Sequence, residues 1–166
     1  MAAASRTMRE GLVVGLAAYA SVAAFYAVFD VLAARGTLYT VNLLGMAVFR
    51  GVRDPAILEL PVPLDLTAIF GYNGLHLVIS LVIGTIVVRL VAQAEHHPAQ
   101  AHLVLFTIVA GFVVTILGVG VLTTPMRPVL PWWSIVVANS LAVVVGGSYL
   151  LRKHPDIWQR LIPFTG

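Results

Sequence analysis

The sequence predicts an all-α integral membrane protein, a four-transmembrane-helix bundle. A short interfacial or re-entrant helix is expected in the first outer loop, and a surface helix at the C-terminus. Of its 166 residues, 60% are hydrophobic and only 10% are charged, whereas about a quarter of a soluble domain is charged. Four apolar segments also reach the length of about 20 helical residues that crosses a bilayer. The composition and these four segments predict a single membrane domain, 1–166, with spans at 11–34, 66–92, 102–122 and 131–151.

The first apolar segment, 11–34, follows the short basic start SRTMREG and could be mistaken for a signal peptide. Its apolar stretch is longer than the hydrophobic region of a signal peptide and ends in FDVLAARG. We therefore expect an uncleaved signal anchor. Because backbone polar groups in lipid must be satisfied within the segment, this span and the other three are expected to be helices rather than strands.

The connection at 36–65 is the longest loop. Its first half, TLYTVNLLGMAVFRG, is apolar but too short to span, which favours an interfacial or re-entrant helix. Thr37 is the expected N-cap of that helix and Gly51 its expected end. The second half, VRDPAILELPVPLD, is rich in proline and should run extended over the outer surface until Asp65 caps the second span. Such a loop could dock a partner.

The remaining connections are short. The segment AEHHPAQAH forces the second and third spans into an antiparallel hairpin, and Pro131 is placed to start the fourth span. Trp132 and Trp133 follow at the expected depth of the lipid headgroups. The segment 152–166 alternates basic and apolar residues around Trp158, which predicts a helix on the inner surface with Trp158 as a third interfacial anchor.

The charged residues predict topology rather than nucleic-acid binding. The formal charge of +3 comes mainly from arginines spread over the ends of the apolar segments, not clustered on one face. With the N-terminus inside, six Lys and Arg flank the spans on the inner side and four on the outer side. This bias predicts a multi-pass protein with both termini in the cytoplasm. The arginine, alanine, valine and glycine content suggests a bacterial inner membrane.

Small and polar residues recur at helical spacing within the spans. Lipid-facing positions favour large apolar side chains, so these stripes are expected to face protein. The second span carries Asn73, His76, Ser80 and Gly84, the third Thr107, Gly111, Thr115 and Gly118, and the fourth Asn139, Ala142 and Gly146.

A helical rise of about 1.5 Å per residue places several of these polar residues at similar depth. The predicted interhelical polar layer in the outer half of the bundle consists of Asp30, Asn73, His76, Thr115 and Asn139. Within it, a neutral His76 is expected to hydrogen-bond to Asn139, to Thr115 or to a backbone carbonyl. Asp30 lies near the end of its helix and close to Arg35, which favours a snorkelling or salt-bridged carboxylate over a proton relay.

A second interpretation makes His76 a cofactor ligand, because an intramembrane ionisable residue suggests function. Two histidines at matching depth would be needed for a bis-histidine haem, and the other four histidines are predicted at the opposite surface. A chlorin magnesium, which takes one axial nitrogen, or a haem or quinone site shared with a partner chain, fits a single histidine.

Metal binding and catalysis have little support in the sequence. Glu95, His96, His97 and His102 resemble a metal cluster, but adjacent histidines on a helix diverge by about 100° and Pro98 separates them from His102. The chain has no cysteine and no evident nucleophile-base pair, phosphate loop or carboxylate pair. We therefore expect no metal site and no enzyme.

The segments VNLLGMAVFRG, YNGLHLVISLVIG and PWWSIVVANSLAVVVGGSYLLRKHP, which together extend over most of the chain, resemble a group of small uncharacterised four-helix bacterial membrane proteins. That resemblance implies the architecture and no activity.

These observations predict a non-catalytic accessory subunit that packs against other integral membrane subunits and lipids in a larger complex. An energy-converting complex, respiratory or photosynthetic, is the class we favour. One alternative is a membrane protein that binds a cofactor through His76. Another is a small homo-oligomeric transporter or channel, but the apolar stretch 81–88 argues against a water-accessible path through the membrane.

Overall fold

A computed structural model describes residues 2–54 and 62–156. In order, its helices are α1 (Ala2–Leu32), α2 (Tyr39–Phe49), α3 (Leu66–His96), η2 (Pro98–Gln100), α4 (Ala101–Leu122), η3 (Thr124–Met126) and α5 (Trp132–Lys153). These residues contain no strand, and α1, α3, α4 and α5 are long and apolar enough to cross a membrane. The predicted helical fold with four such helices is confirmed. The stretch 55–61 of the proline-rich loop, and Trp158 with most of the predicted C-terminal helix, lie outside the described residues.

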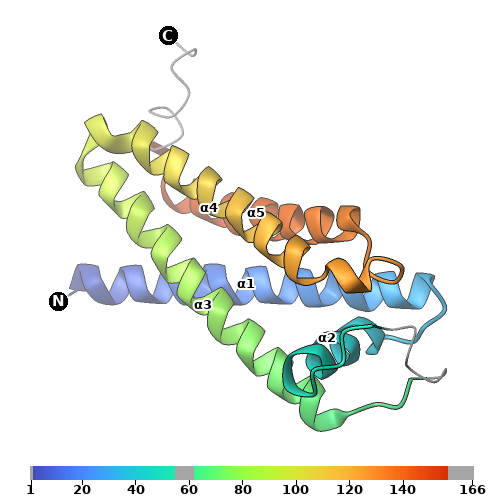
Figure 1. Ribbon diagram of the computed structural model, residues 1–166. Coiled ribbons are helices and arrows are strands. Elements are labelled where there is room, and N and C mark those ends of the chain that lie inside the picture. The colour runs from blue at the N-terminus through green and yellow to red at the C-terminus, as the bar shows by residue number, and fades with distance from the viewer. Residues whose placement is uncertain (1, 55–61, 157–166) are drawn as a thin grey trace.

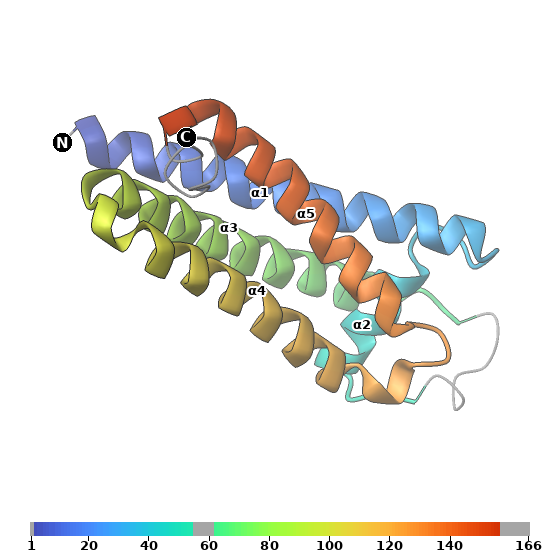
Figure 2. The same cartoon turned by 90° about the horizontal axis from the view of Figure 1, so that it is seen from above.

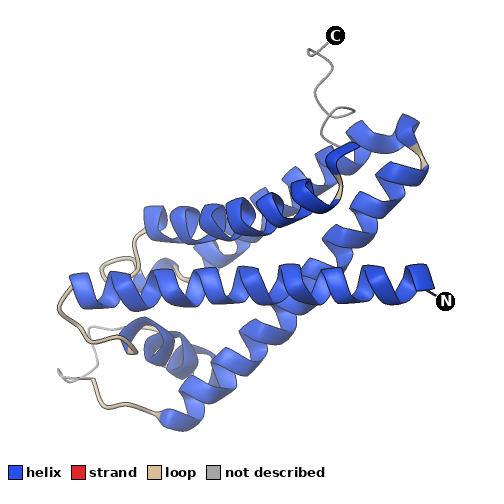
Figure 3. Ribbon diagram, turned by 180° about the vertical axis from the view of Figure 1, so that it is seen from behind, coloured by secondary structure: helices blue, strands red, loops and turns tan. Residues whose placement is uncertain are grey.

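The four long helices form an elongated bundle with two distinct ends (Figures 1 and 2). The start of α1, the turn between α3 and α4 and the end of α5 lie at one end, which we call the terminal end. At the other, called the α2 end, lie α2 and the turn between α4 and α5. Seen from behind, α1 crosses α3 at a steep angle (Figure 3). Helix α1 packs chiefly against α3 and α5, and α2 against α3.

The helix ends follow local chemistry. Helix α1 ends where Ala34 adopts a positive φ of 56°, which lets the Arg35 N–H reach back to the Asp30 carbonyl at 2.9 Å. Gly51, with a φ of 71°, follows the last residues of α2 and confirms the predicted stop. Asp65 caps α3, as predicted, by accepting the Ala68 N–H. At the start of α2 the prediction was wrong, because the N-cap is Leu38 and not Thr37.

The crossing of α1 and α3 is a contact between backbones. Gly11 and Gly15 on α1 face Gly84 on α3, and a Cβ added at Gly15 would lie 2.6 Å from both the Leu81 Cα and the Ser80 carbonyl oxygen. A Cβ added at Gly84 would overlap the backbone of Gly11 and Gly15. Small residues let helices approach this closely and gain dispersion contacts along the crossing.

Helix α4 is held mainly near its two ends. Its buried residues are Ala101 and Val104 near the start, and Gly120 near the finish, where the Trp132 ring covers it. Arg127 closes that end, since its Nη2 donates to the Gly120 carbonyl and its guanidinium lies 4.4 Å from the Trp132 ring centroid. Between these points α4 exposes large apolar side chains, among them Phe106, Val109 and Val114.

The crossing yields a matched pair of predictions. Gly84→Ala should lower the free energy of unfolding by about 1–3 kcal/mol, because the added methyl group meets backbone that cannot yield without separating α1 from α3. Gly74→Ala, on the same helix but with nothing within 4 Å of the new Cβ, should be neutral or stabilising by up to about 1 kcal/mol. Thermal unfolding in detergent measures both, and equal effects of the two changes would contradict the backbone contact.

Candidate functional site

His76 lies half-buried on α3 among aromatic side chains. Its ring meets Tyr19 of α1 edge to face, with centroids 5.3 Å apart, and Tyr72 at 6.1 Å. The Tyr19 hydroxyl donates to Asn73 Oδ1 at 2.9 Å, and Asn73 Nδ2 donates to the Ile69 carbonyl. Neither nitrogen of His76 forms a hydrogen bond to any of the described residues. The site therefore combines an aromatic wall with an imidazole that has hydrogen-bonding capacity left over.

The five residues of the predicted polar layer do not share one hydrogen-bond network. Tyr19 brings Asn73 and His76 together, but Thr115 Oγ1 donates to the Gly111 carbonyl and Asn139 Nδ2 to the Ile135 carbonyl, each within its own helix. Serine, threonine and asparagine in a helix often bond the carbonyl four residues back. Residues that lie at equal depth in a bundle can also point their side chains in different directions, so equal depth alone does not predict a contact.

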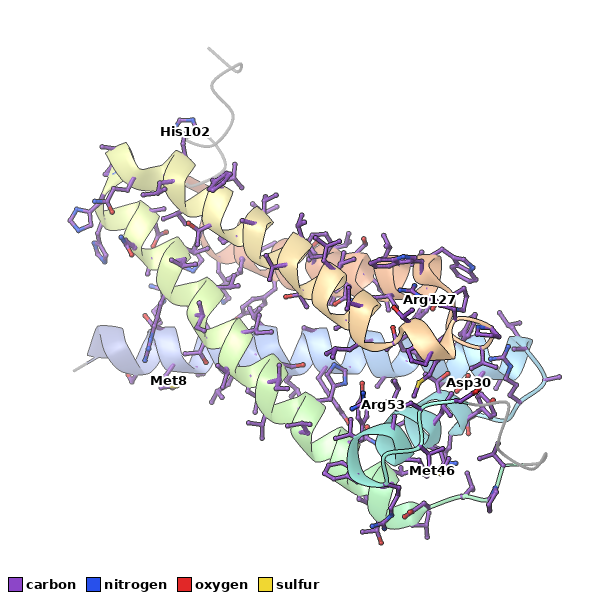
Figure 4. The ribbon with its side chains drawn as sticks, in the orientation of Figure 1. Met8, Asp30, Met46, Arg53, His102 and Arg127 are labelled. Atoms are coloured by element: carbon purple, nitrogen blue, oxygen red, sulfur yellow. The ribbon has the colours of Figure 1, made fainter. Side chains whose placement is uncertain are left out.

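Asp30 serves a different purpose from the one predicted. It is almost fully buried, at 1% exposure, and holds α2: Oδ2 accepts the Thr40 N–H at 2.7 Å and Oδ1 accepts the Thr40 hydroxyl at 2.6 Å. Figure 4 shows it at the α2 end, where the two helices meet. The expectation of a snorkelling or Arg35-paired carboxylate was wrong. Arg35 Nη1 donates instead to the Val129 carbonyl at 2.7 Å.

The carboxylate of Asp30 acts as an N-cap supplied by another helix. The first N–H groups of a helix lack partners in the helix and favour a negative charge beside them. Leu38, which occupies the N-cap position of α2, has no side-chain oxygen and makes no capping bond. Asp30 satisfies one of those donors, the Thr40 N–H, and so joins the end of α1 to the start of α2.

The other side of α2 is fixed to the start of α3. Asn42, only 1% exposed, accepts the Asp65 N–H at 2.9 Å and donates to the Pro63 carbonyl at 3.1 Å. Arg50 Nε donates to Asp65 Oδ2 at 2.8 Å. The hydrogen bond from Arg50, followed by that from the Ala68 N–H, lowers the pKa of Asp65, which lies just before the candidate membrane span Leu66–His96.

Packing completes the attachment of α2. Gly45 lies against α3 so closely that a Cβ there would sit 2.5 Å from the Ala68 carbonyl oxygen. Leu43 joins Met126, Leu130 and Ile135 in a buried apolar cluster. The short helix is thus tied to α1, to α3 and to the turn before α5, and its sequence VNLLG supplies both the polar and the close-packing contacts.

Sequence reasoning missed a second polar cluster at the terminal end. Glu10 of α1 and Glu95 of α3 both contact the ring of His154, which follows the last residue of α5. Their separation along the chain, up to 144 residues, hides this meeting from any local pattern. The neighbouring His96, His97 and His102 are exposed, and His102 points away from the bundle in Figure 4. Among the described residues, no group of acidic residues and histidines is arranged to hold a metal ion.

Two of the three predicted interfacial anchors, Trp132 and Trp133, lie where α5 begins. Trp132 covers Gly120 and remains 40% exposed, while Trp133 is 55% exposed and meets Phe29 of α1 edge to face, with ring centroids 5.6 Å apart. Part of each indole therefore contacts protein and part remains open at the α2 end.

No family model, no curated protein and no solved structure matches this chain.

Asp30→Asn should weaken the attachment of α2 to the end of α1. An amide cannot accept from both Thr40 donors as the carboxylate does, and a buried donor left without a partner costs about 1–3 kcal/mol. Hydrogen exchange of residues 39–49 in detergent should therefore accelerate, and Thr40→Val should accelerate it too, with the double variant little worse than either single one.

Thr107→Val is the matched control, because Thr107 is exposed and bonds only the Leu103 carbonyl of its own helix. Thr107→Val should leave the hydrogen-exchange rates of α2 unchanged. If Asp30→Asn behaves like this control, Asp30 does not hold α2.

Proposed function

We propose that this chain is a non-catalytic accessory subunit of a larger membrane complex, and that α4 is the helix through which it packs against another subunit. The supporting observation is an open face of small side chains on α4, which we define as Thr107, Gly111, Thr115 and Gly118. A Cβ added at Gly111 or at Gly118 would meet nothing within 4 Å. Thr107 is exposed and Thr115 partly so.

Elsewhere in the molecule, small residues that face another helix bring that helix into close contact. Gly11, Gly15 and Gly84 bring α1 and α3 into backbone contact, and Gly45 brings α2 onto α3. Small residues at intervals of three or four create a flat groove that a second transmembrane helix can enter. On α4 the same pattern has none of the helices that the structure describes against it, so a helix of another integral membrane subunit is the occupant we propose.

Membrane insertion is part of the proposal. Every long helix exposes large apolar side chains, such as Leu32 of α1 at 82%, Phe70 of α3 at 72%, Phe106 of α4 at 70% and Val144 of α5 at 61%. Soluble monomers rarely expose contiguous apolar areas of this kind. The proposed location is a bacterial inner membrane with the terminal end in the cytoplasm, since the sequence puts six Lys and Arg in the inner flanks of the spans against four in the outer flanks.

The polar contacts of the described residues fit a structural role. Those at the α2 end join helix ends to one another, and those of Thr107, Thr115 and Asn139 close within single helices. An energy-converting complex, respiratory or photosynthetic, remains the class of partner that we propose.

Copurification in mild detergent tests the proposed packing of α4. The wild-type chain should comigrate with larger integral membrane subunits. Gly111→Leu combined with Gly118→Leu should abolish comigration, because two leucines fill the open face while leaving the bundle itself intact.

Val109→Leu combined with Val113→Leu is the control, since both valines are exposed on the opposite side of α4, at 51% and 45%. This variant should comigrate like the wild type. Isolation of the wild-type chain only as a free monomer or homo-oligomer would falsify the proposal.

A second candidate function is cofactor binding through His76, and a specific observation favours it. The imidazole is half-buried between α1 and α3, yet neither ring nitrogen is hydrogen-bonded to a described residue. The ring therefore has a nitrogen left to ligate a metal and an N–H left to donate. The nitrogen suits axial ligation of a chlorin magnesium or of a haem shared with a neighbouring chain, and the N–H suits a hydrogen bond to a shared quinone.

An absorption spectrum of the purified complex tests this second candidate. His76→Ala should abolish or shift a visible band if the imidazole is an axial ligand, whereas Asn73→Ala, one turn away, should leave the band position unchanged. The absence of any visible band, or a band unaltered by His76→Ala, rules out ligation of a chlorin or haem by His76.

A further inference from the structure

Two adjoining hollows open on the surface where α1 ends and α2 begins, at the α2 end of the bundle (Figure 1). The first, which we call the apolar groove, has a volume of about 230 Å³ and follows the last two turns of α1. The second, called the Arg35 hollow, has a volume of about 550 Å³, within the range of small-molecule sites. Thr37 lines both, so the two hollows are continuous with each other.

The apolar groove suits a hydrocarbon chain. The described residues that line it besides Thr37 are Ala27, Val28, Val31 and Leu32. The two valines and Leu32 are exposed, at 58%, 54% and 82%, and none of the four carries a polar side-chain atom. A chain lying here would cover apolar surface that the bundle itself leaves open.

The Arg35 hollow presents a guanidinium that is already held in place. Arg35 Nη1 donates to the Val129 carbonyl at 2.7 Å, and the guanidinium carbon lies 5.8 Å and 5.3 Å from the ring centroids of Phe29 and Tyr39. A guanidinium has five N–H donors, and the bond to Val129 is the one hydrogen bond that Arg35 makes to the described residues. The remaining donors form a planar fork of the kind that binds phosphate.

The charge of this hollow favours an anion. Among the described residues, Arg35 is the one charged residue that lines either hollow. The carboxylate of Asp30 interacts with Arg35, but Asp30 is 1% exposed, lines neither hollow and has both oxygens bonded by Thr40. The described lining thus offers a cation and no carboxylate.

The guanidinium also lies at a depth that suits a lipid headgroup. The Phe29 ring that contacts Arg35 also meets Trp133 edge to face, with ring centroids 5.6 Å apart. Tryptophan favours the level of the headgroups. In a membrane, a cation beside Trp133 and an apolar groove leading away along α1 would match the two parts of a lipid.

We propose that the two hollows bind one anionic phospholipid, with its phosphate on Arg35 and one acyl chain in the apolar groove. A lipid is the occupant rather than free phosphate because the groove adjoins the cation. The inference rests on the membrane insertion that forms part of the proposed function, and it does not require the packing of α4 against another subunit.

Native mass spectrometry of the full chain, purified in detergent and freed of lipid, tests the site. One molecule of dioleoylphosphatidylglycerol should bind more tightly than any that follow. Dioleoylglycerol, which lacks the phosphate, and glycerol 3-phosphate, which lacks the acyl chains, should each bind at least about tenfold more weakly. Equal binding of either compound overturns the proposal, since it would show that the phosphate or the chain is not recognised.

Two variants locate the lipid. Arg35→Gln removes the cation and should weaken binding of the first lipid by about tenfold. Val28→Trp fills the apolar groove and should weaken it as well, without touching the bond that Arg35 makes to Val129. Binding that is unchanged in either variant overturns the proposal.

Each variant has a matched control. Arg53→Gln removes an exposed arginine that lines neither hollow, and Val13→Trp changes an exposed valine fifteen residues earlier on α1. Both controls should bind the lipid like the wild type. Because the isolated chain is measured, loss of comigration with other subunits would leave this result unaffected.

Discussion

The backbone contact between α1 and α3 is the constraint on which the rest of the bundle depends. Gly11, Gly15 and Gly84 bring the two helices so close that no side chain separates them. Two helices that cross at one point can pivot about it, so each end of the bundle needs its own attachment. Those attachments include polar contacts that the apolar crossing lacks: Asp30, Asn42 and Asp65 at the α2 end, and Glu10, Glu95 and His154 at the terminal end.

The two ends of the bundle use different polar groups. At the α2 end, the Asp30 carboxylate accepts the Thr40 N–H, the Asn42 amide accepts the Asp65 N–H, and the hydrogen bond from Arg50 lowers the pKa of Asp65. At the terminal end, the His154 imidazole lies between the carboxylates of Glu10 and Glu95. The α2 end thus joins α1, α2 and α3, whereas the terminal end joins α1 and α3 to the end of α5.

Much of the fold could be predicted from sequence, and much of the site could not. Apolar length located the four long helices, and local chemistry located the stop at Gly51 and the cap at Asp65, since both depend on a few neighbouring residues. The role of Asp30 was missed because its partner, Thr40, belongs to another helix. The meeting of Glu10 with His154 was missed because it depends on the three-dimensional path of the whole chain. Helical spacing identified small-residue stripes but did not distinguish Gly84, which packs against α1, from Gly111, which packs against none of the described residues.

The pairing of α1 with α3 and α5, rather than with its neighbour α2, has a consequence for biosynthesis. Helix α1 is made before α3 and α5, so Gly15 can meet Gly84 only after some seventy further residues have been made, and Glu10 can meet His154 only after 144. Until then the glycine face of α1 has no partner from α3, and the small-residue face of another helix can occupy it. The correct crossing of α1 and α3 therefore has to form late, against competing contacts made earlier.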